Sequence, residues 1–155
     1  TIMAHRPRNT EEPILDRARW RRIIFYSIVL SAGTIGAVYF SHFFIHTGDD
    51  WLVERCNNIL FFTLIFSQLF HVFNMGSIDA PFWRTEVVRN RNVWYAIVAC
   101  IFIIVGLYLI EPIRTALSVV PMSAADWGVS IGTGLLSMVI IRLGKHLEFF
   151  QNEKL

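Results

Sequence analysis

The sequence predicts an all-α membrane protein, a four-helix transmembrane bundle with both termini cytoplasmic. Apolar residues make up 54% of the 155-residue chain and charged residues 17%, below the roughly 25% that is typical of soluble proteins. Four long segments are almost free of formal charge, and each can cross the roughly 30 Å hydrocarbon layer as a helix. The basic residues gather in the segments that this topology places on one side of the membrane.

The four predicted spans are separated by short polar segments. The first, 23–45, contains no Asp, Glu, Lys or Arg. The second, 56–77, is also free of formal charge but carries several polar side chains. The third, 93–110, is almost purely apolar, and the fourth, 124–141, holds a single aspartate as its only charge. A soluble four-helix bundle is the alternative, but it would need a polar stripe on each outer face, which the third span does not offer.

A helix-capping signal marks the start of the fourth span. Ser123 and Asp126 stand three residues apart, the spacing at which each side chain can bond to the backbone amide of the other. The fourth helix is therefore expected to begin between them.

The distribution of basic residues predicts the orientation. Residues 1–22 hold six Arg, and a cytoplasmic N-terminus divides all Lys and Arg into 12 inside and 2 outside. The positive-inside rule then places both ends in the cytoplasm. The expected organisation is a cytoplasmic basic segment, 1–22, a four-helix transmembrane domain, 23–142, and a cytoplasmic tail, 143–155. The expected partner is the lipid bilayer, and no nucleic acid, because the net charge is only +2.

Small residues recur at helix-packing spacing in two spans. Gly33 and Ala37 stand four apart in the first, and Gly128 and Gly132 form a GxxxG in the fourth. Such pairs let helix backbones approach closely in lipid. They predict a close helix contact, whose partner is either internal or another chain.

The second span carries a one-sided polar stripe. At about 100° per residue, its polar side chains fall within an arc of roughly 140°; they are Thr63, Ser67, Gln68, His71 and Asn74. Unpaired polar groups in hydrocarbon cost several kcal/mol, so this face must meet protein or water. One interpretation is the wall of an ion pathway, with Gln68 as a possible cation ligand through its carbonyl oxygen and His71 lining the pathway. The other is that both side chains only hydrogen-bond to neighbouring helices.

The sequence shows no catalytic or cofactor-binding residues. It contains no phosphate loop, CxxC, HExxH or GxSxG motif, and no carboxylate lies deep in a predicted span. A cation site would therefore need acidic ligands from elsewhere, and the chain is not expected to be a complete enzyme.

Several motifs resemble a known family. The run 61–74, FFTLIFSQLFHVFN, resembles the eighth transmembrane helix of type II P-type cation-transporting ATPases, with QLFHxFN as its most specific part. Residues 92–94 look like the opening of the ninth helix in that family, and 121–127 like the loop into the tenth. Residues 3–15 are similar to the cytoplasmic stretch after the sixth helix. The resemblance covers residues 3 to about 150.

This resemblance implies that the chain corresponds to helices seven to ten of a calcium-pump-like ATPase. In the family, the phosphorylated aspartate and the nucleotide-binding domain lie upstream, so Mg-ATP and the transported cation belong to the parent pump. The expected partners are the remaining transmembrane helices and cytoplasmic domains, in a cell (inner) or organelle membrane. At the position matching Gln68, the family's calcium pumps with one site carry Gln, as do sodium/potassium pumps, and calcium pumps with two sites carry an acidic ligand. The resemblance therefore favours a pump with one calcium site or a pump for a related cation. The Arg-Thr pair that usually opens the eighth helix is replaced by Asn57 and Asn58.

Two other functions remain open at this stage. One is a free-standing four-helix accessory or regulatory protein derived from such a pump. The other is a small oligomeric channel, which the lack of a membrane carboxylate disfavours. The chain begins with Thr1, so the expectation is either a fragment of a pump or a short reading frame that starts at Met3.

Overall fold

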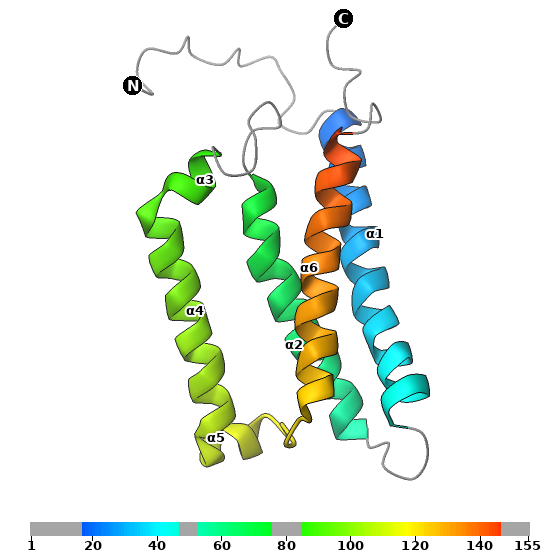
Figure 1. Ribbon diagram of the computed structural model, residues 1–155, viewed down its shortest axis with the longest axis vertical. Helices are drawn as coiled ribbons and strands as arrows, with labels where there is room; N and C mark the ends of the chain where they lie inside the picture. Colours follow the sequence, from blue (N-terminus) through cyan, green and yellow to red (C-terminus); the bar gives the residue numbers. More distant parts are fainter. Residues whose placement is uncertain (1–16, 47–52, 76–84, 147–155) are drawn as a thin grey trace, which may run out of the picture.

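Four long helices dominate the computed structural model, which describes residues 17–46, 53–75 and 85–146 (Figure 1). They are α1 (Arg17–Phe40), α2 (Val53–His71), α4 (Arg91–Leu109) and α6 (Ala124–His146). The short elements are the π-helix η2 (Ser41–Ile45), the 3-10 helix η3 (Val72–Met75), α3 (Glu86–Arg89) and α5 (Glu111–Ala116). The described residues contain no strand, so the predicted all-α, four-helix fold is confirmed.

The four long helical segments are apolar enough to cross a membrane. They cover Arg19–Ile45, Val53–Met75, Arg91–Leu109 and Ala124–Lys145. The first helix begins before the apolar run 23–45, because its arginines extend the helix at the membrane edge. Most of the outward-facing side chains on these helices are large and apolar, as expected for surfaces in contact with lipid.

The orientation in the membrane stays a prediction. A reporter fused after Leu155 is expected to read cytoplasmic, because the 12 to 2 division of Lys and Arg favours that side. The measurement is the activity of paired reporters, one active only in the cytoplasm and one only outside it. An external signal at this position would contradict the four-span topology.

Helices α1, α2 and α6 form a three-helix core, and α4 stands beside it (Figure 1). α2 and α6 share the largest interface, and α1 packs against both. Aromatic rings join α4 to the core: the ring centroids of Phe73 and Trp94 lie 5.6 Å apart, and those of Tyr108 and Trp127 lie 5.2 Å apart. The core and α4 therefore meet through side chains rather than through close backbones.

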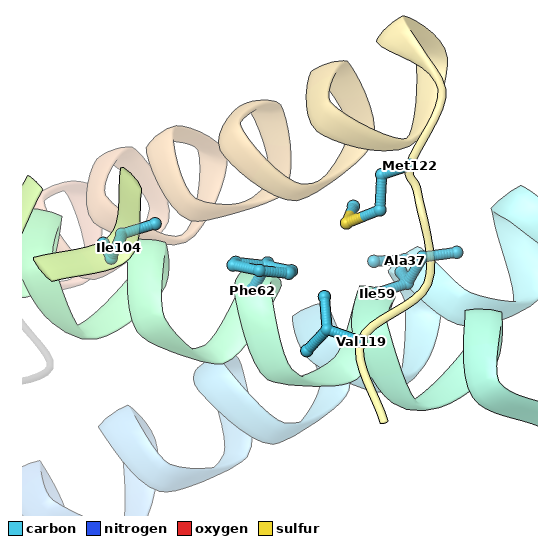
Figure 2. Packing of buried hydrophobic residues seen from close by; sticks show 6 residues of the cluster. All are labelled: Ala37, Ile59, Phe62, Ile104, Val119 and Met122. Carbon is cyan, nitrogen blue, oxygen red and sulfur yellow. The ribbon is translucent and has the colours of Figure 1, made fainter. Parts of the chain in front are cut away.

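A cluster of buried apolar side chains fills the space between the helices near the α5 end (Figure 2). Ile59 and Phe62 of α2 are completely buried at its centre. The other members come from α1, α4 and the segment before α6: Ala37, Ile104, Val119 and Met122. This cluster fixes the position at which α6 begins.

The connection from α5 to α6 is held by specific hydrogen bonds. Ser118 adopts a left-handed conformation with φ 54°, and the amide of Val119 bonds to the carbonyl of Arg114 at 2.9 Å, as in a Schellman motif. Asn58 of α2 then donates to the carbonyl of Val120 at 2.7 Å. These bonds place the start of α6 against α2.

Close approach of the helices depends on three glycines. A Cβ added at Gly33 would lie 2.9 Å from Ser137 Oγ, and one at Gly134 would lie 3.0 Å from the backbone carbon of Phe66. One added at Gly144 would lie 2.6 Å from the Phe25 ring. Gly33 thus lies at the contact of α1 with α6, whereas Gly134 allows α2 and α6 to approach, and the GxxxG pattern did not indicate it.

The other small residues of the predicted packing pairs line an open groove. A Cβ added at Gly128 or Gly132 would meet nothing within 4 Å. Both glycines, with Ala37 and Gly36, line an apolar groove of about 560 Å³ between α1 and α6. Which partner uses the GxxxG of α6 therefore remains a prediction.

Candidate functional site

Gln68 lies on the exposed face of α2. It makes no hydrogen bond with any residue that the structure describes, and it stands seven residues from Met75, roughly 11 Å from that end of the span by helix rise. At about 100° per residue, the exposed positions around it fall within roughly 60° of one another; they are Asn57, Phe61, Leu64 and Gln68. A single amide therefore projects from an otherwise largely apolar face at membrane depth.

His71 is turned toward α1. Its ring meets the Tyr26 ring edge to face, with centroids 5.0 Å apart, and it is half-buried. Its Nδ1 atom is buried without a hydrogen-bond partner among the described residues. The structure thus places His71 at the contact of α1 with α2, to one side of the exposed face that carries Gln68.

The other members of the predicted polar stripe point into the three-helix core. Asn74 is buried and donates to the carbonyl of Met138 at 3.0 Å. Thr63 and Ser67 are buried between α2 and its neighbours. The stripe is therefore divided, because its 140° arc spans more than one neighbour of α2.

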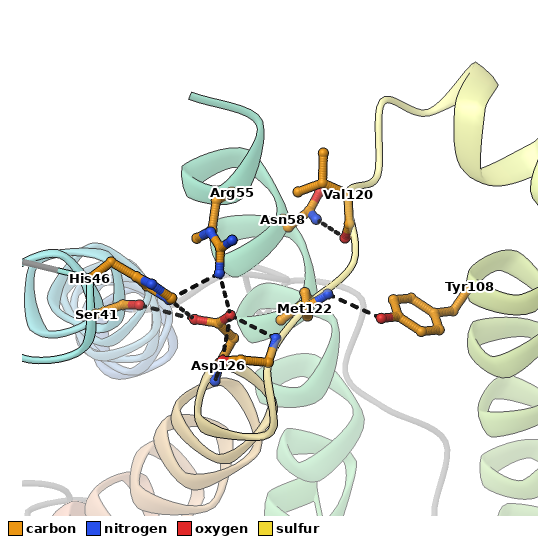
Figure 3. Close-up of polar contacts among 9 residues, drawn as sticks. Ser41, His46, Arg55, Asn58, Tyr108, Val120, Met122 and Asp126 are labelled. Carbon is orange, nitrogen blue, oxygen red and sulfur yellow. Dashed lines mark hydrogen bonds and ion pairs between the residues drawn. The ribbon is translucent and has the colours of Figure 1, made fainter. Parts of the chain in front are cut away.

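A second polar site lies where η2, α2 and α6 meet (Figure 3). The carboxylate of Asp126 is fully buried and accepts hydrogen bonds from three segments of the chain. Its Oδ1 lies 2.7 Å from His46 Nε2 and 3.2 Å from Ser41 Oγ. Its Oδ2 lies 3.2 Å from Arg55 Nη1 and accepts from the amide and hydroxyl of Ser123 at 2.9 and 2.8 Å. We call these five residues the Asp126 cluster.

The charges of the Asp126 cluster are mutually dependent. The side chains of His46 and Arg55 are only 11% and 18% exposed, and that of Asp126 is not exposed at all. Because a carboxylate only accepts, the short contact assigns a proton to Nε2 of His46. Arg55 Nη1 lies 3.2 Å from the same nitrogen, so the carboxylate offers an acceptor to two donors that stand against each other. The cluster ties three helix ends together.

The sequence predicted two of the five residues of this cluster, Ser123 and Asp126. The predicted capping box is confirmed, since the Asp126 amide bonds to Ser123 Oγ at 3.2 Å and the Ser123 amide to Asp126. His46 and Arg55 were missed because they lie 80 and 71 residues away in the chain. The available signal was that Asp126 is the only charge in its span and Arg55 is the only basic residue of its loop.

The described residues offer few metal ligands. No group of three or more His, Cys, Asp or Glu side chains gathers anywhere in residues 17–46, 53–75 and 85–146. Gln68 supplies one carbonyl oxygen, which suits a hard cation but is weak as a single ligand. The oxygens of Asp126 already accept bonds from the cluster described above.

The four apolar helices and their polar positions define a multi-pass helical membrane protein. The family model described as "Cation transporting ATPase, C-terminus" matches residues 1–147. The chain therefore belongs to this family, the C-terminal membrane region of cation-transporting ATPases, and the predicted resemblance is confirmed. A search of the curated proteins found no match.

Proposed function

We propose that the chain serves as the C-terminal membrane module of an ATP-driven calcium pump, in which Gln68 lines the cation pathway. One observation carries the proposal: an amide without a hydrogen-bond partner among the described residues projects from the exposed face of α2 at membrane depth. Such a group in contact with lipid would cost several kcal/mol. Further transmembrane helices of the same pump, packed against this face of α2, would give the Gln68 amide its polar partners.

In this arrangement the module has two tasks. The three-helix core of α1, α2 and α6 supports the helices that carry the acidic ligands. Gln68 then adds a neutral carbonyl oxygen, a ligand type that Ca²⁺ accepts together with carboxylates. The resemblance to pumps with one calcium site, which carry Gln at the matching position, supports calcium as the cargo. Mg-ATP would be bound and hydrolysed by the upstream domains.

Replacing Gln68 by alanine in the ATPase that contains this module tests the proposal. We expect the calcium concentration for half-maximal phosphorylation by ATP to rise roughly tenfold, the value of a hydrogen-bonding or ligand contact to a charged group. The maximal phosphorylation level should change little, because the catalytic domains are untouched.

A neighbour on the same face provides the control. Leu64 is 47% exposed on the same side of α2, and Leu64→Ala removes apolar contact without removing a ligand. We expect Leu64→Ala to leave the calcium dependence unchanged. Equal calcium dependence in Gln68→Ala and the parent pump would reduce Gln68 to a packing role and overturn its place in the pathway.

A further inference from the structure

Three buried hydroxyl groups in the three-helix core have no hydrogen-bond partner among the described residues. Thr63 and Ser67 of α2 are 0% and 1% exposed, and Ser130 of α6 is 0% exposed. The buried hydroxyl of Thr34, by contrast, donates to the carbonyl of Leu30 at 2.7 Å. An unsatisfied hydroxyl at membrane depth has no water outside the bundle to compensate it. The three groups therefore need a partner within the core.

The register of α2 and α6 brings the three hydroxyls to one level. The two helices run in the same direction, and Phe66 meets Gly134 while Asn74 bonds to Met138. These contacts correspond to offsets of 68 and 64 residues. With these offsets, Ser130 lies level with positions 62 to 66 of α2, between or beside the two α2 hydroxyls.

The hydroxyls also share a direction. At about 100° per residue, Ser67 lies about 60° from Phe70 around the axis of α2. The other angles between these two hydroxyl residues and Phe70 or Asn74 are all within roughly 40°. Phe70 and Asn74 both contact α6. On α6, Ser130 lies about 40° from Gly134, the residue that faces α2. The two helices thus turn these hydroxyls toward their common interface.

A small side chain of α1 lies at the same level. Gly33 of α1 lies against Ser137 of α6, and Ser41 bonds to Asp126. Ala37 stands midway between Gly33 and Ser41, so it lies beside the part of α6 between Asp126 and Ser137. Ala37 is 3% exposed and leaves more room than a larger apolar residue would.

We propose that the hydroxyls of Thr63, Ser67 and Ser130 together bind an ordered water molecule in the membrane-embedded core. A hydroxyl can donate one hydrogen bond and accept two, and a buried water typically makes about three bonds to such groups. Water fits better than a cation, because these ligands are neutral and the oxygens of Asp126 already accept bonds from His46 and Arg55.

The test is a set of isosteric substitutions in the whole chain. Thr63→Val, Ser67→Ala and Ser130→Ala are each expected to lower the folding equilibrium constant roughly fivefold, since each removes one bond to the water. The triple variant should lose on the order of tenfold rather than a hundredfold, because the water and its remaining partners are removed together. Reversible unfolding in mixed micelles gives these constants.

Thr34→Val is the matched control, because its hydroxyl bonds within its own helix; its effect should simply add to those of the other variants. In bilayers, solid-state NMR transfer from water should reach the Thr63 methyl group quickly and the Thr34 methyl group slowly. The proposal would be overturned if the effects of the three single substitutions on the folding equilibrium constant multiplied independently in the triple variant. Coupling without water transfer would also overturn it, because that would mean direct hydroxyl-to-hydroxyl bonds.

Discussion

Asp126→Ala is expected to lower the free energy of unfolding by about 3–5 kcal/mol, the usual loss when one partner of a buried ion pair is removed. Without the carboxylate, Arg55 stays next to His46, with Nη1 and Nε2 only 3.2 Å apart. Ser41 and Ser123 also lose their acceptor. Reversible unfolding of the purified chain in mixed micelles measures this difference.

An exposed acid at the same end of the bundle provides the comparison. Glu111 begins α5 and is exposed, so Glu111→Ala should change the free energy of unfolding by no more than about 0.5 kcal/mol. An Asp126→Ala protein within about 1 kcal/mol of the parent chain would show that the Asp126 cluster does not hold the helix ends together.

Gly134→Leu is expected to destabilise the bundle by about 1–3 kcal/mol, because it forces α2 and α6 apart. Even a bare Cβ at this position would lie 3.0 Å from the backbone carbon of Phe66 and 3.1 Å from its Cβ. Backbone cannot rotate away as a side chain can. The same unfolding measurement reports the change.

The matched substitution is Gly132→Leu, two residues earlier on the same helix. A Cβ there meets nothing within 4 Å, so the leucine extends into the groove between α1 and α6. It should raise stability by up to about 1 kcal/mol through its higher helix propensity. Equal losses in the two variants would contradict the close contact assigned to Gly134.

The sequence predicted what depends on local pattern. Long apolar runs are sufficient to define membrane helices, because each must satisfy its backbone bonds internally. The Ser123 and Asp126 capping box could also be predicted, because both residues lie within one helical turn. The family was also recognisable, because the motif around Gln68 is a continuous stretch of residues.

What the sequence could not predict depends on which helices are neighbours. The GxxxG of Gly128 and Gly132 lies on the groove, whereas Gly134 makes the close contact with α2. Small residues on several faces of α6 look alike until its partners are known. Likewise, Arg55 and Asp126 meet across 71 residues of chain, and nothing local indicates that pairing.

The arrangement of α4 has a mechanical consequence. α2 and α6 are joined at both ends, by the Asp126 cluster and by the bond from the Lys145 ammonium to the carbonyl of Asn74, and the cluster also holds the end of α1 through Ser41. α4 joins them through the ring pairs of Trp94 and Tyr108 and through the Tyr108 hydroxyl, which accepts a hydrogen bond from the Met122 amide at 3.0 Å. The stiffness of the module therefore resides in a three-helix strut. α4 is attached to this strut by its side chains, with Ile104 in the buried cluster and Tyr108 at the start of α6.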